Sequence, residues 1–364
     1  MFANCYKNKK VLITGNTGFK GSWLTLWLLS LGAEVFGISK DIQTSPSLFE
    51  ILKLQNKINF YQEDILDYPK ISELIYNIKP DFVFHLAAQA IVSKSFLNPL
   101  ETLKTNIIGT ANILESLRNL NNPCNVIIIT SDKCYENEEC LEGYRETDRL
   151  GGKDLYSASK ASAELVIKAY FNSFFSKPDS KVRIVSARAG NVIGGGDWAP
   201  DRIIPDCVRE WSQNKAVNIR NPNSTRPWQH VLEPLSGYLQ VGYLLSENLS
   251  LNGESFNFGP LPEQCKPVLE LIKDISSYWN IKENIFNIVS DNKFPEARLL
   301  KLNCEKALTL LNWQPTLTYQ ETVKFTSQWY LHFYKNDLDI KNFTLNQIHD
   351  YQNIAQKRKL EWSR

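Results

Sequence analysis

The sequence predicts an α/β fold in which a doubly wound parallel sheet is followed by a smaller C-terminal domain. Over the first 190 residues, short runs that are apolar throughout alternate with longer amphipathic segments. Strands that are apolar on both faces need helices on both sides of their sheet, and helical crossovers make such strands parallel. After residue 196 the alternation loosens, and Pro, Asn and Trp become more frequent. The 364 residues are enough for one large domain or two smaller ones.

The elements of both parts follow in chain order from these patterns. We expect strands at residues 11–14, 34–38, 82–87, 126–130 and 182–188. Helices are expected at 21–31, 98–117 and 156–173, and shorter ones in the second part at 202–214, 231–246 and 266–279. The first domain should span 1–196 and take back 231–260, and the second should span mainly 197–336. Residues 337–364 form a tail that is either an appended helix or partly disordered.

Composition and charge exclude several classes of function. The formal net charge of +2 gives no reason to expect a nucleic acid or a membrane surface as partner. The seven cysteines include no CxxC pair, so we expect reduced thiols and neither a disulfide framework nor a metal site. The first ten residues are polar, and no run of about 18 apolar residues occurs. These features predict a cytoplasmic protein.

Three glycines lie between the first predicted strand and the first predicted helix. Together they form the pattern GxxGxxG, which allows a tight turn and lets a pyrophosphate approach the backbone at the helix N-terminus. A plain strand–helix turn also uses glycine, but the flanking strand and helix favour a Rossmann dinucleotide-binding domain. The residues expected to contact the cofactor here are Gly15, Thr17, Gly18, Phe19, Lys20 and Gly21.

The choice between NAD and NADP stays open at the end of the second strand. Asp41 is suited to bond the ribose hydroxyls of NAD, whereas Lys40 is suited to attract the 2′-phosphate of NADP. Asp64 and Ile65 fit a contact to adenine, although a solvent-facing loop is the alternative. The segment that ends the next strand has small side chains where a cofactor would pass, and supplies Leu86, Ala87, Ala88 and Gln89.

A tyrosine and a lysine are spaced as a catalytic pair. Tyr156 and Lys160 stand four residues apart and so share one face of a helix. A cation there is expected to lower the phenol pKa, so that the tyrosine can remove a hydroxyl proton while hydride leaves the same carbon. A surface tyrosine and a solvated lysine are the alternative. Ser131, at the end of the preceding strand, completes the triad that makes catalysis the better interpretation.

These motifs and three longer ones resemble the extended short-chain dehydrogenase/reductase family, also called the NAD-dependent epimerase/dehydratase family. Within that family, the chain looks most like the nucleotide-sugar 4,6-dehydratases of the CDP-glucose branch. The stretches that carry the resemblance are GNTGFKGSWL at 15–24, TSDKCYEN at 130–137, YSASK at 156–160, RAGNVIGGGDW at 188–198, DRIIPD at 201–206 and RPWQHVLEPL at 226–235.

The resemblance implies a reaction and two further catalytic residues. Relatives that eliminate water carry an acid and a base directly after the serine, and those positions hold Asp132 and Lys133 here. Tyr156 would oxidise C4 of CDP-glucose together with NAD, Lys133 would take the C5 proton, Asp132 would protonate the leaving 6-hydroxyl, and hydride would return to C6. The product, CDP-4-keto-6-deoxyglucose, would feed deoxysugar synthesis for surface polysaccharide such as lipopolysaccharide O-antigen. The same chemistry on another nucleotide sugar, such as a GDP-linked hexose or heptose, is the alternative, and an epimerase or reductase fits less well.

The resemblance also implies a substrate site and an assembly. Asn191 and several arginines should hold the nucleotide, while serine and asparagine side chains should line the sugar site. The substrate residues expected are Ser93, Asn106, Asn191, Arg202, Arg220, Arg226 and Arg298. Asn16 and Leu155 depart from the branch, which commonly has His and Pro there. Relatives pair through the helices at 98–117 and 156–173, so a homodimer or homotetramer is expected.

Overall fold

A seven-stranded parallel sheet forms the centre of the molecule in a computed structural model, which describes residues 1–279, 285–289, 299–335 and 339–364. Its strand order is β11-β6-β5-β4-β1-β2-β3. The doubly wound fold predicted from the sequence is therefore confirmed. The strands, in chain order, are β1 (Lys10–Thr14), β2 (Glu34–Ser39), β3 (Asn59–Gln62), β4 (Phe82–His85), β5 (Cys124–Ile129), β6 (Val182–Ala189) and β11 (Ser255–Phe258).

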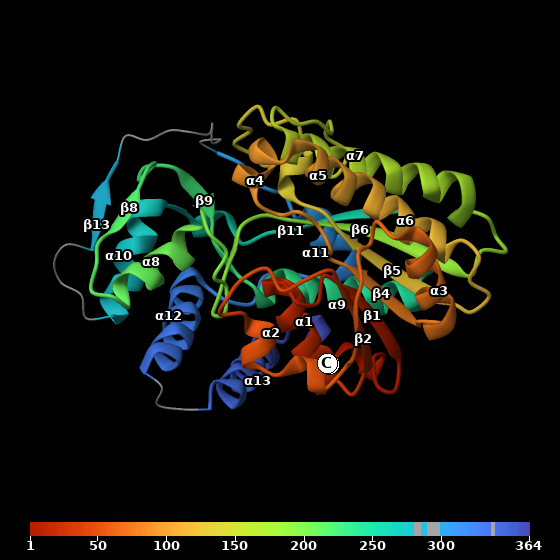
Figure 1. Ribbon diagram of the computed structural model, residues 1–364, viewed down its shortest axis with the longest axis horizontal. Helices are drawn as coiled ribbons and strands as arrows, with labels where there is room; N and C mark the ends of the chain where they lie inside the picture. The colour runs from red at the N-terminus through yellow and green to blue at the C-terminus, as the bar shows by residue number, and fades with distance from the viewer. Residues whose placement is uncertain (280–284, 290–298, 336–338) are drawn as a thin grey trace.

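Helices cover both faces of this sheet (Figure 1). One face carries α3 (Tyr68–Ile78), α6 (Gly109–Leu117) and α7 (Leu155–Tyr170), and the opposite face carries α1 (Phe19–Ser30) and α9 (Leu232–Glu247). The strands between the two layers are almost completely buried, as in β4, where all four residues are inaccessible to solvent. The apolar runs in the sequence reflect this double burial.

The predicted helix at 98–117 is divided into three pieces. It consists of α5 (Pro99–Leu103), a π-helical segment (Lys104–Ile108) and α6. Just before it lies the short helix α4 (Val92–Leu97). A π-turn rotates the residues that follow it relative to a regular helix, and such turns are frequent at functional sites. Here it brings the side chain of Asn106 against the loop after β4. Helix α7 likewise ends in a π-helical segment, Phe171–Phe175.

Several elements were not expected from the sequence. Strand β3 and helix α3 follow β2 and close one edge of the sheet, and β11 closes the other. β3 is only partly buried and carries Asn and Gln at its two ends, so its apolar pattern is weak. The strand expected at 82–87 ends at His85, because Ala87 leaves the sheet to pack against Gly15.

The C-terminal part forms a separate layer beside the sheet (Figure 1). It contains helices and short two-stranded pairings rather than one continuous sheet. The helices are α8 (Ile203–Trp211), α10 (Val268–Tyr278), α11 (Glu305–Leu311) and α12 (Tyr319–Lys335). The short strands are β7 (Val192–Ile193), β8 (Val217–Ile219), β9 (Thr225–Pro227), β10 (Gln229–His230), β12 (Cys265–Pro267) and β13 (Phe286–Ile288).

The tail is an ordered helix. Helix α13 (Ile340–Lys357) begins with a cap from Asp339 and packs near α1, and its Tyr351 stacks on Trp362. Trp362 in turn stacks on Phe2, so residues from both ends of the sequence share one aromatic cluster. Among the described residues, we find no helix with the length and apolarity needed to span a membrane. In the same residues no cluster of His, Cys, Asp or Glu is arranged to hold a metal ion.

Candidate active site

Two of the three glycines in the loop are required by close packing of the surrounding backbone. Gly15 has φ +76°, and a Cβ there would lie 2.7 Å from the backbone nitrogen of Ala87. A Cβ on Gly21 would overlap the carbonyl oxygen of Gly15, so this glycine permits the close packing of helix on strand. A Cβ on Gly18 would touch only that same oxygen, at 3.4 Å, so the surrounding protein does not itself demand a glycine there.

The N-terminus of α1 is suited to bind an anion. Gly18 is its N-cap residue, and no side chain of the described residues caps the helix. The first backbone N–H groups of this 12-residue helix are therefore left for another acceptor, and the helix dipole favours a negative one. The glycine geometry and the uncapped helix together fit the pyrophosphate of a dinucleotide.

Polar groups at the end of β2 continue this site. Ser39 donates a hydrogen bond to Oδ1 of Asn16 at 2.8 Å, and the Thr17 hydroxyl donates to the Asp41 carbonyl oxygen at 2.7 Å. The carboxylate of Asp41 is exposed and accepts from Gln43. Lys40 forms an ion pair of 3.0 Å with Asp64, which raises the pKa of Lys40. Since its charge is already compensated by Asp64, Lys40 offers less attraction to a 2′-phosphate than the sequence alone indicated.

The loop after β4 is held by internal hydrogen bonds. Gln89 uses its side chain to bond Thr102 and the Ile91 backbone, and its backbone nitrogen donates to Oδ1 of Asn106 at 2.8 Å. Ile65 is buried against Gly109. Leu86, Ala87 and Ala88 are only partly buried, and they lie next to the glycine loop. The loop therefore offers small side chains and backbone, rather than the Gln89 amide, to a cofactor.

The prediction that Asn106 lines a sugar site is wrong. This side chain is 1% exposed, and its Nδ2 atom donates to the Gln89 carbonyl oxygen and to Ser159 Oγ at 2.8 Å. The π-turn turns Asn106 inward, where it ties the β4 loop to helix α7. His85 is also buried and accepts or donates only to Thr14 and Thr110, and burial lowers its pKa to about 3, so it is a neutral structural group.

Five predicted catalytic side chains come from two neighbouring elements. Ser131, Asp132 and Lys133 follow β5 in a single 3₁₀ turn, η4 (Asp132–Cys134), while Tyr156 and Lys160 lie on the first turns of α7. Helix α7 begins at Leu155 because Asp154 caps it by accepting from the Ser157 nitrogen at 2.9 Å. The structure packs η4 against α7 and so brings the two groups together.

The pKa of the acidic member of this group is raised by burial. Asp132 is 6% exposed, and burial raises the pKa of its carboxyl group above the usual value. Its Oδ1 atom accepts from the Ser131 hydroxyl at 2.9 Å. The charges of Lys133 and Lys20 act in the opposite direction, but burial is the larger influence. A carboxyl group that retains its proton is suited to act as a general acid.

The expected lowering of the Tyr156 pKa is contradicted by the structure. Burial raises the pKa of Tyr156 to about 12, and a hydrogen bond to Ser131 lowers it by less. Burial likewise lowers the pKa of Lys160 to about 8, because a buried ammonium group loses its hydration. The i, i+4 spacing predicts that Tyr156 and Lys160 lie close together, but it does not predict that both are buried. In this protein, an added positive charge beside Tyr156 would be needed to favour the phenolate.

A small cavity, with room for little more than one water molecule, lies beside the predicted acid and base. Its lining residues are Asp132, Lys133, Asn191, Arg226 and Leu300. It therefore combines the two predicted dehydration groups with two of the predicted substrate residues, and Arg226 adds a positive charge at its wall. A Cβ on Gly190 would lie 2.7 Å from Oδ2 of Asp132, so the backbone before Asn191 passes directly against the acid.

The remaining substrate candidates lie close by, but they are paired. Arg202 bonds Asp197 at 2.8 Å, and its charge acts on both Tyr156 and Lys20, which places it near the catalytic group. Ser93 donates to Asp201 at 2.6 Å, and Arg220 lies 4.0 Å from the same carboxylate. These contacts join α4 to the C-terminal part. Arg298 lies outside the described residues.

Lys20 lies near the predicted catalytic residues, which the sequence did not indicate. It was expected to contact a cofactor as part of the glycine loop, yet its charge interacts with Asp132, Lys160 and Arg202. Burial and the two nearby cations lower its pKa to about 7. Spacing along the chain carries no signal for this, since Lys20 and Asp132 are brought together only by the packing of the sheet.

The chain resembles known proteins over most of its length. The family model described as GDP-mannose 4,6 dehydratase matches residues 12–326. A CDP-glucose 4,6-dehydratase from Salmonella typhimurium is 44% identical, covering 97% of this chain and 98% of the relative. A dTDP-D-glucose 4,6-dehydratase from Homo sapiens is 27% identical, covering 90% and 92%.

Solved structures share the fold. Pal from Bacillus thuringiensis has a TM-score of 0.76 at 25% identity and covers 89% of this chain and 99% of its own. The dTDP-glucose 4,6-dehydratase DesIV from Streptomyces venezuelae, solved with NAD and TYD bound, has a TM-score of 0.76 at 21% identity and covers 89% and 97%. With the glycine loop, the catalytic group and the match over residues 12–326, the chain belongs to the GDP-mannose 4,6 dehydratase family of extended short-chain dehydrogenases/reductases.

Proposed function

We propose that this protein is a CDP-glucose 4,6-dehydratase that forms CDP-4-keto-6-deoxyglucose. The observation that carries the proposal is the convergence of Asp132, Lys133, Asn191 and Arg226 around one small cavity, beside a Tyr–Lys pair on α7. An acid with a raised pKa and an amine base next to one pocket suit the removal of a proton and a hydroxyl group from neighbouring carbons. The 44% identical Salmonella relative bears this name, which supports CDP-glucose over other nucleotide sugars.

The cofactor that fits the glycine loop is NAD. Gly15, Gly18 and the uncapped start of α1 would hold its pyrophosphate, and Asp41 and Asp64 would lie toward its adenosine. The bound cofactor would accept hydride from C4 and later supply it to C6. The positive nicotinamide beside Tyr156 would also favour the phenolate, which the protein alone does not.

The protein groups each move or hold one proton. Tyr156, positioned by Ser131, takes the proton of the sugar 4-hydroxyl, and Lys160 supplies positive charge beneath it. The C4 ketone acidifies the C5 hydrogen, which Lys133 removes. Asp132 gives its proton to the departing 6-hydroxyl, so one water leaves and a C5–C6 double bond remains. When hydride returns to C6, Lys133 gives its proton back to C5. The proton held by Tyr156 is released to solvent, and Asp132 takes up another from solvent. Arg226 and Asn191 bind the diphosphate side of the substrate, and Arg202, Arg220 and Ser93 are further candidates for substrate contact.

Two helices offer a dimer interface. Leu97, Leu100 and Ile108 are exposed on the segment around α4 and α5, and Leu165 is exposed on α7, with side chains 72%, 69%, 51% and 57% accessible. We assign this apolar surface to a homodimer built from both helices of each copy. We assign the enzyme to the cytoplasm, where its seven cysteines would stay as the free thiols of this structure.

The direct test is an incubation of purified protein and NAD with CDP-, dTDP-, GDP- and UDP-glucose in separate reactions, followed by mass spectrometry. Loss of one water from CDP-glucose alone is the expected result. Turnover of another nucleotide sugar would keep the chemistry and reassign the base pocket. No loss of water from any of them, with NAD bound, would overturn the dehydratase proposal.

A further inference from the structure

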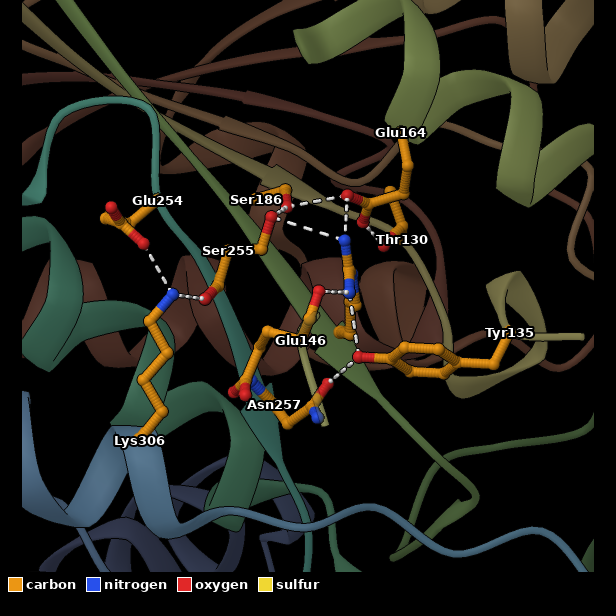
Figure 2. Close-up of polar contacts among 10 residues, drawn as sticks. Thr130, Tyr135, Glu146, Glu164, Ser186, Glu254, Ser255, Asn257 and Lys306 are labelled. Atoms are coloured by element: carbon orange, nitrogen blue, oxygen red, sulfur yellow. Dashed lines mark hydrogen bonds and ion pairs between the residues drawn. The ribbon is translucent and has the colours of Figure 1, made fainter. Parts of the chain in front are cut away.

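A buried ion pair lies directly beneath the catalytic group. Arg188 on β6 and Glu164 on α7 are 3% and 2% exposed at their side chains, and Nη2 of the arginine lies 2.7 Å from Oε2 of the glutamate. Figure 2 shows Glu164 beside Thr130 and Ser186, and Arg188 joins this network through its bonds to Glu164 and Tyr135. Buried ion pairs seldom add much to stability over apolar packing, so stability alone does not explain this pair.

The pair holds both ends of the catalytic turn. On one side, Oε1 of Glu164 accepts from the hydroxyl of Thr130, the residue before Ser131. On the other side, Nη1 of Arg188 donates to the Tyr135 hydroxyl at 2.7 Å, and Tyr135 is the residue that ends the turn. Residues 131–133 therefore lie between Thr130, which bonds Glu164, and Tyr135, which bonds Arg188, and these two partners form one ion pair.

The same pair is fixed to the second catalytic element. Glu164 lies one helical turn after Lys160 and two after Tyr156 on α7, so the three side chains point to one side of the helix. Its Oε2 atom also accepts from Ser186 of β6 at 2.9 Å. The charge of Glu164 raises the pKa of Lys160 against the effect of burial.

We infer that Arg188 and Glu164 are positioning residues that set the distance between the Ser131–Asp132–Lys133 turn and the Tyr156–Lys160 pair, acting through Thr130 and Tyr135. The inference rests on the dehydratase reaction proposed above. Proton transfers to and from one sugar ring require five side chains to keep a fixed geometry, and small displacements of such groups cost much rate. Because the ion pair contacts both the turn and α7, it keeps the distance between them fixed.

The test removes the two links and leaves the ion pair intact. Thr130→Val deletes the hydroxyl that bonds Glu164, and Tyr135→Phe deletes the hydroxyl that accepts from Arg188 and donates to Asn257. Each variant is expected to lose about tenfold in kcat, with little change in KM for the nucleotide sugar, because the turn moves while the substrate walls stay. Glu254→Gln is the matched control, since its carboxylate binds Lys306 on the far side of Ser255 in the same network (Figure 2).

A second measurement does not depend on turnover. Hydrogen exchange of the backbone amides in 131–135 should be faster in Thr130→Val and Tyr135→Phe than in the wild-type protein or Glu254→Gln. A lower melting temperature with unchanged kcat and unchanged exchange would reduce the pair to a stability element and overturn the inference. If the wild-type protein turns over no sugar, the proposed reaction fails by itself, and the exchange result still decides whether the pair holds the turn.

Discussion

The backbone of Gly190 lies against the carboxyl group of Asp132, with the position of a Cβ on Gly190 only 2.7 Å from Oδ2. Since Gly190 directly precedes Asn191, one backbone segment borders both the acid and the diphosphate side of the proposed pocket. Any side chain at Gly190 would have to displace the acid.

Gly190→Ala should therefore reduce catalysis without preventing folding. The added methyl group pushes the Asp132 carboxyl group out of line with the substrate, and we expect a loss of about tenfold or more in kcat. Steady-state kinetics and a thermal melt of the same sample measure it. Wild-type kcat in a variant that folds normally would show that Asp132 does not need its present position.

Asp132→Asn should separate stability from activity. Because the folded-state pKa of Asp132 is raised, the folded protein binds this proton more tightly than the unfolded chain. Its contribution is therefore favourable at acid pH and is lost as pH rises from the ordinary carboxyl range through the raised pKa. The variant cannot ionise, so its advantage in melting temperature over the wild type should grow as pH rises above the ordinary carboxyl range and then level off, while water loss slows markedly.

The spectrum gives a further signature of Asp132→Asn. If loss of the 6-hydroxyl is slowed after oxidation at C4, reduced cofactor should accumulate during turnover and absorb in the near ultraviolet. An absorbance trace that matches the wild type would argue against Asp132 as the acid.

Lys133→Ala should stop elimination and leave the fold intact. Lys133 is half-buried at the pocket wall, so its removal opens no core cavity. We expect no loss of water from CDP-glucose and no exchange of the C5 hydrogen with deuterated solvent. Solvent exchange at C5 with normal rates in this variant would assign the base to another group.

Two glycines should respond differently to alanine. Gly15→Ala places a Cβ in the left-handed region and against Ala87, so it should lower the melting temperature. Gly18→Ala meets only one oxygen at 3.4 Å, so it should fold nearly normally and bind NAD more weakly. Calorimetric titration with NAD and thermal unfolding of both variants make the comparison. Unchanged NAD affinity in Gly18→Ala would place the pyrophosphate elsewhere.

The proposed dimer has its own test. Leu100→Glu puts a charge in the apolar surface of α5 and should yield monomers in sedimentation velocity at micromolar protein. Ile288→Glu, at a 63% exposed isoleucine on β13 far from α5 and α7 (Figure 1), is the control and should leave the assembly unchanged. A wild-type protein that sediments only as a monomer would refute the interface.

Local patterns in the sequence predicted the parts of the site that depend on local geometry. The glycine loop follows from its place between an apolar strand and an amphipathic helix, and the Tyr156–Lys160 pair follows from helical spacing. The direction of the Asn106 side chain depends on a π-turn, which leaves no periodic signal. The high pKa of Tyr156 depends on burial by segments distant in sequence, so it could not be read from its neighbours.

The strands at the two edges of the sheet were also not predicted from local patterns. Strand β3 is partly polar because it lies at an edge, and β11 reaches the other edge only after the chain has passed through much of the C-terminal part. The sequence carries little signal for the pair of Glu164 and Arg188. β6 contains Arg183 and Ser186 as well as Arg188, and only the structure shows that Arg188 is buried against a partner on α7.

The aromatic cluster of Phe2, Trp27, Tyr351 and Trp362 has a consequence for how the protein is made. During synthesis, Trp27 on α1 is made more than three hundred residues before Tyr351 and Trp362, the residues that pack against it. Contacts between such distant segments slow folding, because a long loop must close before they form. Until then the nascent chain exposes tryptophan next to the helix that begins at the glycine loop, a surface on which chaperones would act.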